Sequence, residues 1–317
     1  MHNEFNLIEK YFTRPAPRAD LGVGDDAALV RVAEGNQLVI STDMSVAGTH
    51  FFADAAPFDI GWKALAVNVS DIAAMGAQPK WATLAIALPD INESWLAEFS
   101  RGFFACADEF GIDLIGGDTT KGPLNISVTI MGEVPIGKAL KRSGAQVGDD
   151  IWVSGQLGSA ALGLAHLHRK ITLKKDVLQA SIHGLCRPAP RANLGLKLRE
   201  IATSCIDISD GLLADLGHIL KTSNCGAMID LEKVPCVDFL KNDLENPQFQ
   251  EFLLAGGDDY ELCFTAPPSK REAINLLSKH ENVLLTCIAS TRMDIGLQAM
   301  FKNKKITLLK QGFDHFG

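Results

Sequence analysis

The sequence predicts an α/β (α+β) fold arranged in two domains. The chain has 317 residues, which is more than one domain usually holds. Its content of 47% apolar and 21% charged residues is typical of a globular protein with large buried cores. Short apolar runs of strand length alternate with longer stretches of helical periodicity, and that alternation is typical of α/β units.

The first half of the chain contains the clearest alternation. Phe5, Ile8 and Phe12 share one face of a helix, and Asn92 precedes a long amphipathic stretch as a candidate N-cap. Acidic Asp71 lies inside an otherwise apolar helix, where burial is costly unless the carboxylate is paired or bound to metal. The predicted helices are 3–12, 58–75 and 93–110, and the predicted strands are 37–42, 81–88, 112–115 and 125–133.

The second half repeats the pattern after a polar, glycine-rich loop at residues 144–150. We therefore expect domains at residues 1–137 and 138–317. The predicted strands of the second domain are 151–154, 227–231, 260–265 and 283–289, and its predicted helices are 159–168, 192–201, 271–279 and one that is opened by residues 207–211 and runs to 220.

Charge and composition exclude several classes of function. A net charge of −8 argues against nucleic acid as a main partner. The first residues form no secretory signal, and no run approaches the roughly 18 to 20 apolar residues of a membrane helix. Seven cysteines without a C-x-x-C pair argue against a zinc site or a disulfide framework. We expect a cytoplasmic protein without a membrane or nucleic-acid partner.

The residues most suggestive of chemistry are aspartates beside Gly, Ser or Thr. The run 114–120 reads as a short strand, two glycines, Asp118 and two threonines, and five further segments resemble it. Carboxylate and hydroxyl oxygens are ligands for a hard cation, and converging carboxylates repel one another unless cations neutralise them. The pattern therefore predicts a site for magnesium and polyphosphate. The five segments are 22–26, 39–43, 68–71, 206–211 and 256–259.

Each aspartate also has an ordinary structural interpretation. Asp in a glycine-containing loop is commonly a turn residue or helix cap, and Asp210 could simply cap the helix that follows it. His50 could be a packed or solvated histidine. The run 132–139 resembles a phosphate-binding P-loop, but Ala139 lacks the hydroxyl that holds magnesium and Pro135 removes an amide donor.

Taken together, these motifs resemble the thiamine-monophosphate kinase family, within the superfamily of aminoimidazole ribonucleotide synthetase. The resemblance spans the whole chain and includes Gly-Val-Gly-Asp-Asp at 22–26, Ser-Thr-Asp-Met-Ser at 41–45, Ile-Gly-Gly-Asp-Thr-Thr at 115–120 and Gly-Gly-Asp-Asp-Tyr-Glu-Leu at 256–262. It implies a homodimer in which the N-terminal sheets form an intersubunit barrel. The implied reaction is ATP + thiamine monophosphate → ADP + thiamine diphosphate, with several Mg²⁺ ions.

The resemblance also implies a role for individual residues. The N-terminal domain would dimerise and bind magnesium and the ATP phosphates, and the C-terminal domain would complete the ATP and substrate sites. The family has Glu where this chain has Asp258, and the tail places Lys310 where relatives carry an aromatic residue. The implied magnesium ligands are Asp26, Ser41, Thr42, Asp43, Asp71, Asp118, Asp207 and Asp210; the implied ATP contacts are Gly117, Asp118, Arg142 and Ser209; the implied substrate contacts are His50, Asp258 and Lys310.

The chemistry of that reaction agrees with the residues present. A phosphate monoester with a second pKa near 6 is largely dianionic at neutral pH, so it is already a nucleophile and needs no general base. The protein then contributes positioning and electrostatic screening. We expect direct transfer of the γ-phosphoryl group without a phosphoenzyme. Two alternatives stay open: another ATP-using member of the superfamily, and a non-catalytic nucleotide or metal sensor.

Overall fold

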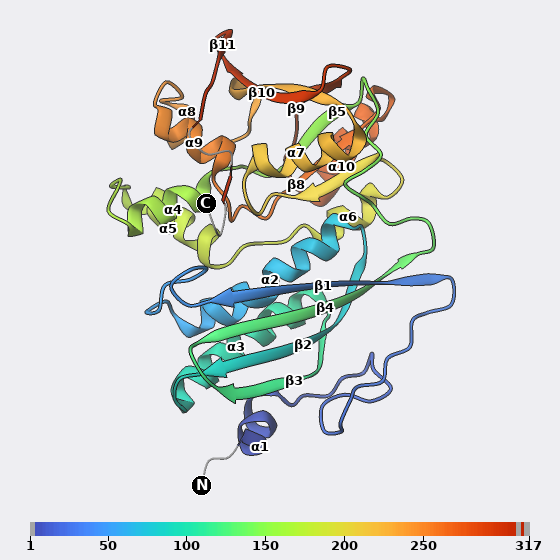
Figure 1. Ribbon diagram of the computed structural model, residues 1–317, viewed down its shortest axis with the longest axis vertical. Helices are drawn as coiled ribbons and strands as arrows, with labels where there is room; N and C mark the ends of the chain where they lie inside the picture. Colours follow the sequence, from blue (N-terminus) through green and yellow to red (C-terminus); the bar gives the residue numbers. More distant parts are fainter. Residues whose placement is uncertain (1–3, 309–311, 314–317) are drawn as a thin grey trace. The chain divides into compact units, whose positions relative to one another are not determined.

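A computed structural model describes residues 4–308 and 312–313 and divides the chain into two compact units. The first unit contains residues 1–73 and 77–139, and the second contains 74–76 and 140–317 (Figure 1). None of the described helices is long and apolar enough to cross a membrane.

The first unit is a four-stranded sheet covered on one face by two long helices (Figure 1). The strands lie in the order β1-β4-β2-β3, so the last strand in the sequence is inserted between the first two. β2 and β3 are parallel, and the other pairs are antiparallel. Its elements are α1 (Glu4–Leu7), the π-helix η1 (Ile8–Phe12), β1 (Asn36–Val46), α2 (Pro57–Ala74), β2 (Gln78–Leu88), α3 (Glu93–Phe110), β3 (Asp113–Lys121) and β4 (Asn125–Pro135).

Helix α3 begins and ends where its capping residues predict. The Asn92 side chain accepts a hydrogen bond from the backbone N–H of Trp95, and Gly111 adopts a left-handed conformation with φ 66°. An N-cap carboxamide and a C-terminal glycine satisfy backbone groups that the helix leaves unpaired. Phe99 and Phe103 on its inner face are fully buried. Both predictions, the helix at 93–110 and its Asn92 cap, are confirmed.

Helices α2 and α3 cross in backbone contact through two glycines. A Cβ on Gly61 would lie 2.1 Å from the carbonyl oxygen of Phe99, and one on Gly102 would lie 1.9 Å from that of Phe58. No side chain fits at either position, so glycine is what permits this close approach. The contact sets how the helix layer, including Asp71, lies against the sheet.

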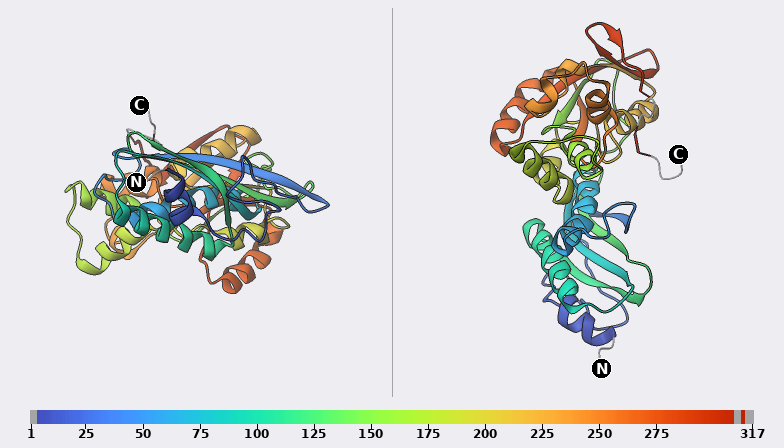
Figure 2. Two further views of the ribbon diagram at one scale, coloured as in Figure 1. Left: turned by 90° about the horizontal axis from the view of Figure 1, so that it is seen from below. Right: turned by 90° about the vertical axis from the view of Figure 1, so that its left-hand side faces the viewer.

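The second unit is a mixed seven-stranded sheet with the strand order β11-β10-β7-β9-β5-β8-β6. Figure 2 shows helices gathered around this sheet. Its core joins Ile151 and Val153 of β5 to Leu212, Leu216 and Ile219 of α7. The elements are β5 (Asp150–Ser154), α4 (Ser159–Leu167), α5 (Lys175–Cys186), α6 (Ala192–Leu198), β6 (Ser204–Asp207), α7 (Leu212–Ser223), β7 (Gly226–Asp230), η2 (Leu231–Lys233), α8 (Asp238–Lys241), α9 (Pro247–Ala255), β8 (Leu262–Ala266), η3 (Pro268–Lys270), α10 (Arg271–Glu281), β9 (Leu285–Arg292), β10 (Gly296–Phe301) and β11 (Lys304–Lys305).

The α/β fold class is therefore confirmed, whereas some elements differ from the sequence prediction. β3 continues six residues past Ile115 to Lys121, so the stretch 116–120 is strand rather than loop. The reason is that β2 offers backbone partners along this whole length, with one irregularity between Ala82 and Thr83. All seven cysteines are free thiols, and five of them are buried, as expected of small apolar residues.

Candidate functional site

The sequence-predicted residues of the first unit divide between the two faces of its sheet. Ser41 and Asp43 on β1 alternate with Leu38, Ile40, Thr42 and Met44, whose side chains are more exposed. Successive side chains of a strand point to opposite faces, so Ser41 and Asp43 share the face that α2 covers. The more exposed residues lie on the face that the helices leave open.

Two of the predicted magnesium ligands are in direct contact. The Ser41 hydroxyl donates a hydrogen bond to Asp71 Oδ2 at 2.5 Å, joining β1 to α2. The backbone N–H of Asp43 donates to the side-chain oxygen of buried Asn68, one turn before Asp71, at 3.2 Å. This corner of the sheet therefore combines carboxylate and hydroxyl oxygens.

Thr42 and Asp118 belong to the opposite face. The Thr42 hydroxyl is 2.8 Å from that of Thr129 on β4. Asp118 is exposed on β3 and aligns with Ala85 of β2, at the edge of the sheet away from β1. Three strand spacings separate the two edge strands, which is about 14 Å. Within one chain, Asp118 is thus apart from the Ser41–Asp71 pair.

Gly117 is a position that no other residue could fill without a shift. Its φ is 152°, and a Cβ there would lie 1.8 Å from the carbonyl oxygen of Leu84. Glycine allows β3 to approach β2 this closely just before Asp118. The predicted role of Gly117 in binding ATP stays a prediction.

His50 and Asp26 lie in turns of the first unit. His50 Nδ1 accepts a hydrogen bond from the backbone N–H of Val46 at 3.0 Å. In the tautomer that this bond selects, the proton is on Nε2, which is then a donor suited to a phosphate oxygen. Asp26 is exposed, and its backbone N–H donates to Asp25 Oδ1 at 2.9 Å.

The second unit brings two predicted loops together. Asp207 ends β6, paired with Leu262 of β8, and is 4% exposed. Beyond this pair the backbone N–H of Tyr260 donates to Ile208 O at 2.8 Å, and that of Asp258 donates to Ser209 O at 2.9 Å. The antiparallel ladder thereby continues into both loops, so that Ser209 and Asp258 are neighbours although 49 positions separate them.

Buried Asp215 holds the loop that contains Ser209 and Asp210. Its Oδ2 accepts the backbone N–H groups of Ser209, Asp210 and Gly211 at 3.0, 3.0 and 3.1 Å. Burial and the nearby charge of Asp210 raise the pKa of Asp215 to about 7, although the hydrogen bonds from the three amides oppose the shift. Asp215 is not among the site residues predicted from the sequence, although an acid in the first turn of an apolar helix is a signal for it.

Two other predicted contacts lie away from this pair of loops. The carbonyl of Arg142 accepts from the Ser223 hydroxyl at the last residue of α7, whereas Ser209 precedes the first turn of that helix. A helix of 12 residues is about 18 Å long. Arg142 and Ser209 could therefore contact only different parts of one nucleotide. Lys310 lies outside the described residues.

Among the described residues, no group of three or more His, Cys, Asp or Glu side chains is placed to hold a metal ion. What the structure does bring together are two smaller oxygen-rich sets, one in each unit: Ser41 with Asp71, and the loop of Asp207, Ser209 and Asp210 with that of Asp258. Their donors are carboxylate and hydroxyl oxygens, the kind that Mg²⁺ prefers, so the residues fit that ion chemically.

Comparison with known proteins identifies the family. Residues 24–134 match the model of the AIR synthase related protein, N-terminal domain, and residues 146–285 match that of its C-terminal domain. The thiamine-monophosphate kinase of Escherichia coli (strain K12) is 48% identical over 319 residues, covering 99% of this chain and 98% of that protein. The chain belongs to the thiamine-monophosphate kinase family.

Solved structures of the thiamine-monophosphate kinase family share the fold. The enzyme from Stenotrophomonas maltophilia K279a is 46% identical, with a TM-score of 0.84 over 93% of this chain and 94% of that chain. A structure described as AaThiL complexed with AMPPCP and TMP is 31% identical, with a TM-score of 0.78 over 98% of this chain and 96% of that chain. The two-domain fold expected from the family resemblance is therefore confirmed.

Proposed function

We propose that this protein is a thiamine-monophosphate kinase, which transfers the γ-phosphoryl group of ATP to the phosphate of thiamine monophosphate. The products are thiamine diphosphate and ADP. The observation that carries the proposal is the 48% identity to the Escherichia coli enzyme over essentially the full length of both chains. A relative at 31% identity binds AMPPCP, an ATP analogue, together with TMP, which supports the same pair of substrates here.

The reaction requires little covalent chemistry from the protein. The acceptor phosphate is largely dianionic at neutral pH and attacks the γ-phosphorus itself, so the chain has to align two anions and screen their repulsion. The Nε2–H that the tautomer of His50 provides is a donor suited to a phosphate oxygen. We propose a single in-line displacement. Stereochemical inversion at a chiral γ-phosphate is the expected outcome, and retention would exclude this mechanism.

We also propose that Mg²⁺ is required. The residues that would hold it are the predicted carboxylate and hydroxyl ligands, with the Ser41–Asp71 pair as the part whose geometry is visible within one unit. When bound, the ions would neutralise charge between the two phosphate groups. The remaining predicted ligands are Asp26, Thr42, Asp43, Asp118, Asp207 and Asp210.

We further propose a homodimer in which two N-terminal sheets meet. β1 is an 11-residue strand at one edge of its sheet, and Ile40 and Met44 are 59% and 56% exposed on the face that the helices leave open. A long edge strand with apolar residues usually has a partner. Sedimentation should give twice the mass of the chain, and Ile40→Glu should give the single mass. A monomeric wild-type protein would refute the dimer.

We propose a cytoplasmic location as well, which the free thiols at all seven cysteines support.

The deciding experiment is an assay with the purified protein, ATP, Mg²⁺ and thiamine monophosphate. We expect equal amounts of ADP and thiamine diphosphate, and no transfer when EDTA is present. ADP formed without thiamine diphosphate would indicate a different acceptor, and binding of ATP without turnover would indicate a sensor. Either result would refute the proposed function.

A further inference from the structure

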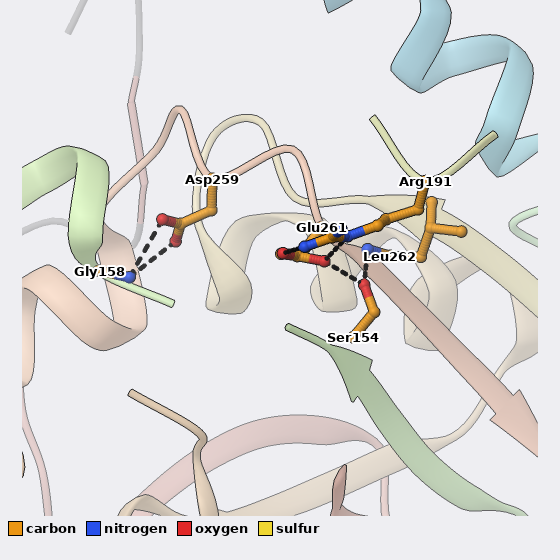
Figure 3. Close-up of polar contacts among 6 residues, drawn as sticks. All are labelled: Ser154, Gly158, Arg191, Asp259, Glu261 and Leu262. Carbon is orange, nitrogen blue, oxygen red and sulfur yellow. Dashed lines mark hydrogen bonds and ion pairs between the residues drawn. The ribbon is translucent and has the colours of Figure 1, made fainter. Parts of the chain in front are cut away.

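A buried ion pair in the second unit has no part in the reaction as proposed. Arg191 donates from Nε to Glu261 Oε2 at 2.7 Å and from Nη2 to Oε1, and the Ser154 hydroxyl donates to Oε2 as well (Figure 3). Ser154 Oγ in turn accepts the backbone N–H of Leu262 at 2.8 Å. Glu261 is 6% exposed. A carboxylate buried to this degree with two parallel Arg donors is strongly fixed in position.

The surroundings are shaped for that carboxylate. Gly155 has a φ of 59°, and a Cβ there would lie 1.9 Å from Glu261 Oε1. The glycine after β5 thus leaves the space that the carboxylate fills. Arg191 follows Pro188 and Pro190, which limit the backbone before it, so its guanidinium is presented from a stiff segment.

Glu261 is also the last residue before β8, and its backbone joins the two candidate loops. Its carbonyl accepts from the backbone N–H of Ile208 at 2.8 Å, one step before the bonds that link Tyr260 to Ile208 and Asp258 to Ser209. Any displacement of Glu261 along the strand therefore shifts loop 256–261 relative to the Ser209 loop. Arg191 therefore fixes the side chain of Glu261, and the backbone of Glu261 aligns Asp258 with the Ser209 loop.

The loop needs such support because its backbone is strained. Asp258 and Tyr260 have φ values of 66° and 50°, in the left-handed region that residues other than glycine rarely adopt. Asp259, between them, accepts the backbone N–H of Gly158 through both carboxylate oxygens at 3.1 and 2.9 Å and so caps α4. Figure 3 shows the Asp259 carboxylate directed at Gly158 and the Glu261 carboxylate directed at Arg191 and Ser154. Asp259 and Glu261 thus anchor the loop through their side chains, while the Tyr260 hydroxyl donates to Asp258 Oδ1 at 3.1 Å.

We infer that Arg191 and Glu261 are positioning residues for the acceptor substrate: they hold the loop 256–261 in its strained conformation and thereby fix Asp258. This inference rests on the proposed function and on the contact between Asp258 and thiamine monophosphate that the family resemblance implies. The effect should concern the acceptor more than ATP, because the Ser209 loop has its own anchor in the three amide bonds to Asp215.

The chain offers a matched control for a role in stability alone. Arg271 donates from Nε to Asp150 Oδ2 at 2.6 Å and from Nη2 to Oδ1 at 2.7 Å, and Asp150 is 1% exposed. Asp150 begins β5 and Ser154 ends it, so the two ion pairs lie at opposite ends of one strand. Both pairs join an arginine to a buried carboxylate, although Arg271 is 57% exposed and Arg191 only 26%, and the control pair is away from loop 256–261.

The kinetic test compares Glu261→Gln with Asp150→Asn in the full-length protein. We expect Glu261→Gln to raise the KM for thiamine monophosphate roughly tenfold or more while the KM for ATP changes less than about twofold. Asp150→Asn should lower the melting temperature without changing either KM. Arg191→Lys keeps the charge but not the two parallel donors, so its KM should lie between those of wild type and Arg191→Met.

Amide hydrogen exchange tests the same inference without substrate. In Glu261→Gln the amides of Asp258 and Tyr260 should exchange at least about tenfold faster than in wild type, with β5 and β8 unchanged. Equal effects of Glu261→Gln and Asp150→Asn on the KM, or unchanged exchange in the loop, would overturn the inference. If Glu261→Gln does not fold, Ser154→Ala should shift both measurements in the same direction, and no shift would also overturn it. Absence of turnover in the wild type would instead refute the proposed function.

Discussion

The contact between α2 and α3 leads to a quantitative prediction for Gly102→Ala. The added Cβ would lie 1.9 Å from the carbonyl oxygen of Phe58, and both sides of this contact are helix backbone. The helices must separate by about 1 Å before the distance reaches the 3 Å that real Cβ contacts respect. Overpacking of this kind costs about 1 to 3 kcal/mol, and rigid partners place it at the upper end.

A small gain opposes that cost. Replacing glycine by alanine inside a helix contributes about 0.5 to 1 kcal/mol through the unfolded chain. We therefore expect Gly102→Ala to lower the free energy of unfolding of the first unit by about 2 kcal/mol. Chemical denaturation followed by tryptophan fluorescence measures this, since Trp62, Trp81 and Trp95 belong to the first unit.

Gly217→Ala is the matched control. Gly217 lies inside α7, and a Cβ there meets nothing within 4 Å. This substitution should leave stability unchanged or raise it by up to about 1 kcal/mol. If Gly102→Ala proved as stable as Gly217→Ala, the helices would not be in the close contact from which the prediction is drawn.

Three further predictions concern carboxylates. Burial raises the pKa of Glu133, but hydrogen bonds from Asn36, Lys80 and a backbone amide outweigh burial and leave the pKa below its usual value. The stability that these bonds contribute is present above the pKa of the unfolded state and is lost as the pH falls through the pKa of the folded state. Glu133→Gln should therefore lower the free energy of unfolding in urea by about 1 to 3 kcal/mol at pH 7, and by progressively less below about pH 4. Asp71→Asn should lower kcat roughly 100-fold with an unchanged circular dichroism spectrum, and near-normal turnover would contradict its proposed role as a metal ligand. Asp215→Ala should cost about 1 to 3 kcal/mol in unfolding free energy, whereas Asp215→Asn keeps an acceptor oxygen for the loop amides and should cost less; equal costs would show that those bonds contribute little.

Local signals in the sequence were sufficient for elements that are determined locally. Asn92 and Gly111 mark the ends of α3 because capping involves only neighbouring residues. The extension of β3 past Ile115 could not be predicted, because it depends on partners in β2 about 30 positions earlier. Helix α5 was missed: its polar and apolar residues alternate less clearly than those of α3, and its buried residues are few.

The candidate site shows the same limit. The aspartates stood out because their motifs repeat along the chain. The partners that hold them did not, because pairs such as Arg191 and Glu261 are 70 positions apart and neither has a distinctive local pattern. A Glu directly before the buried strand 262–266 is costly to bury unless a cation pairs with it, so the sequence did indicate that Glu261 has a partner. Which cationic side chain pairs with Glu261 depends on the tertiary structure.

The insertion of β4 between β1 and β2 has a consequence for biosynthesis. Thr42 of β1 pairs with Thr129 of β4, and the two positions are 87 apart in the sequence. During translation, β1 therefore leaves the ribosome long before its partner exists, and its apolar residues stay unpaired until most of the first unit has been made. Contacts this distant in sequence slow folding and prolong the exposure of apolar residues to aggregation, so β1 is one strand of the nascent chain that benefits from protection by chaperones.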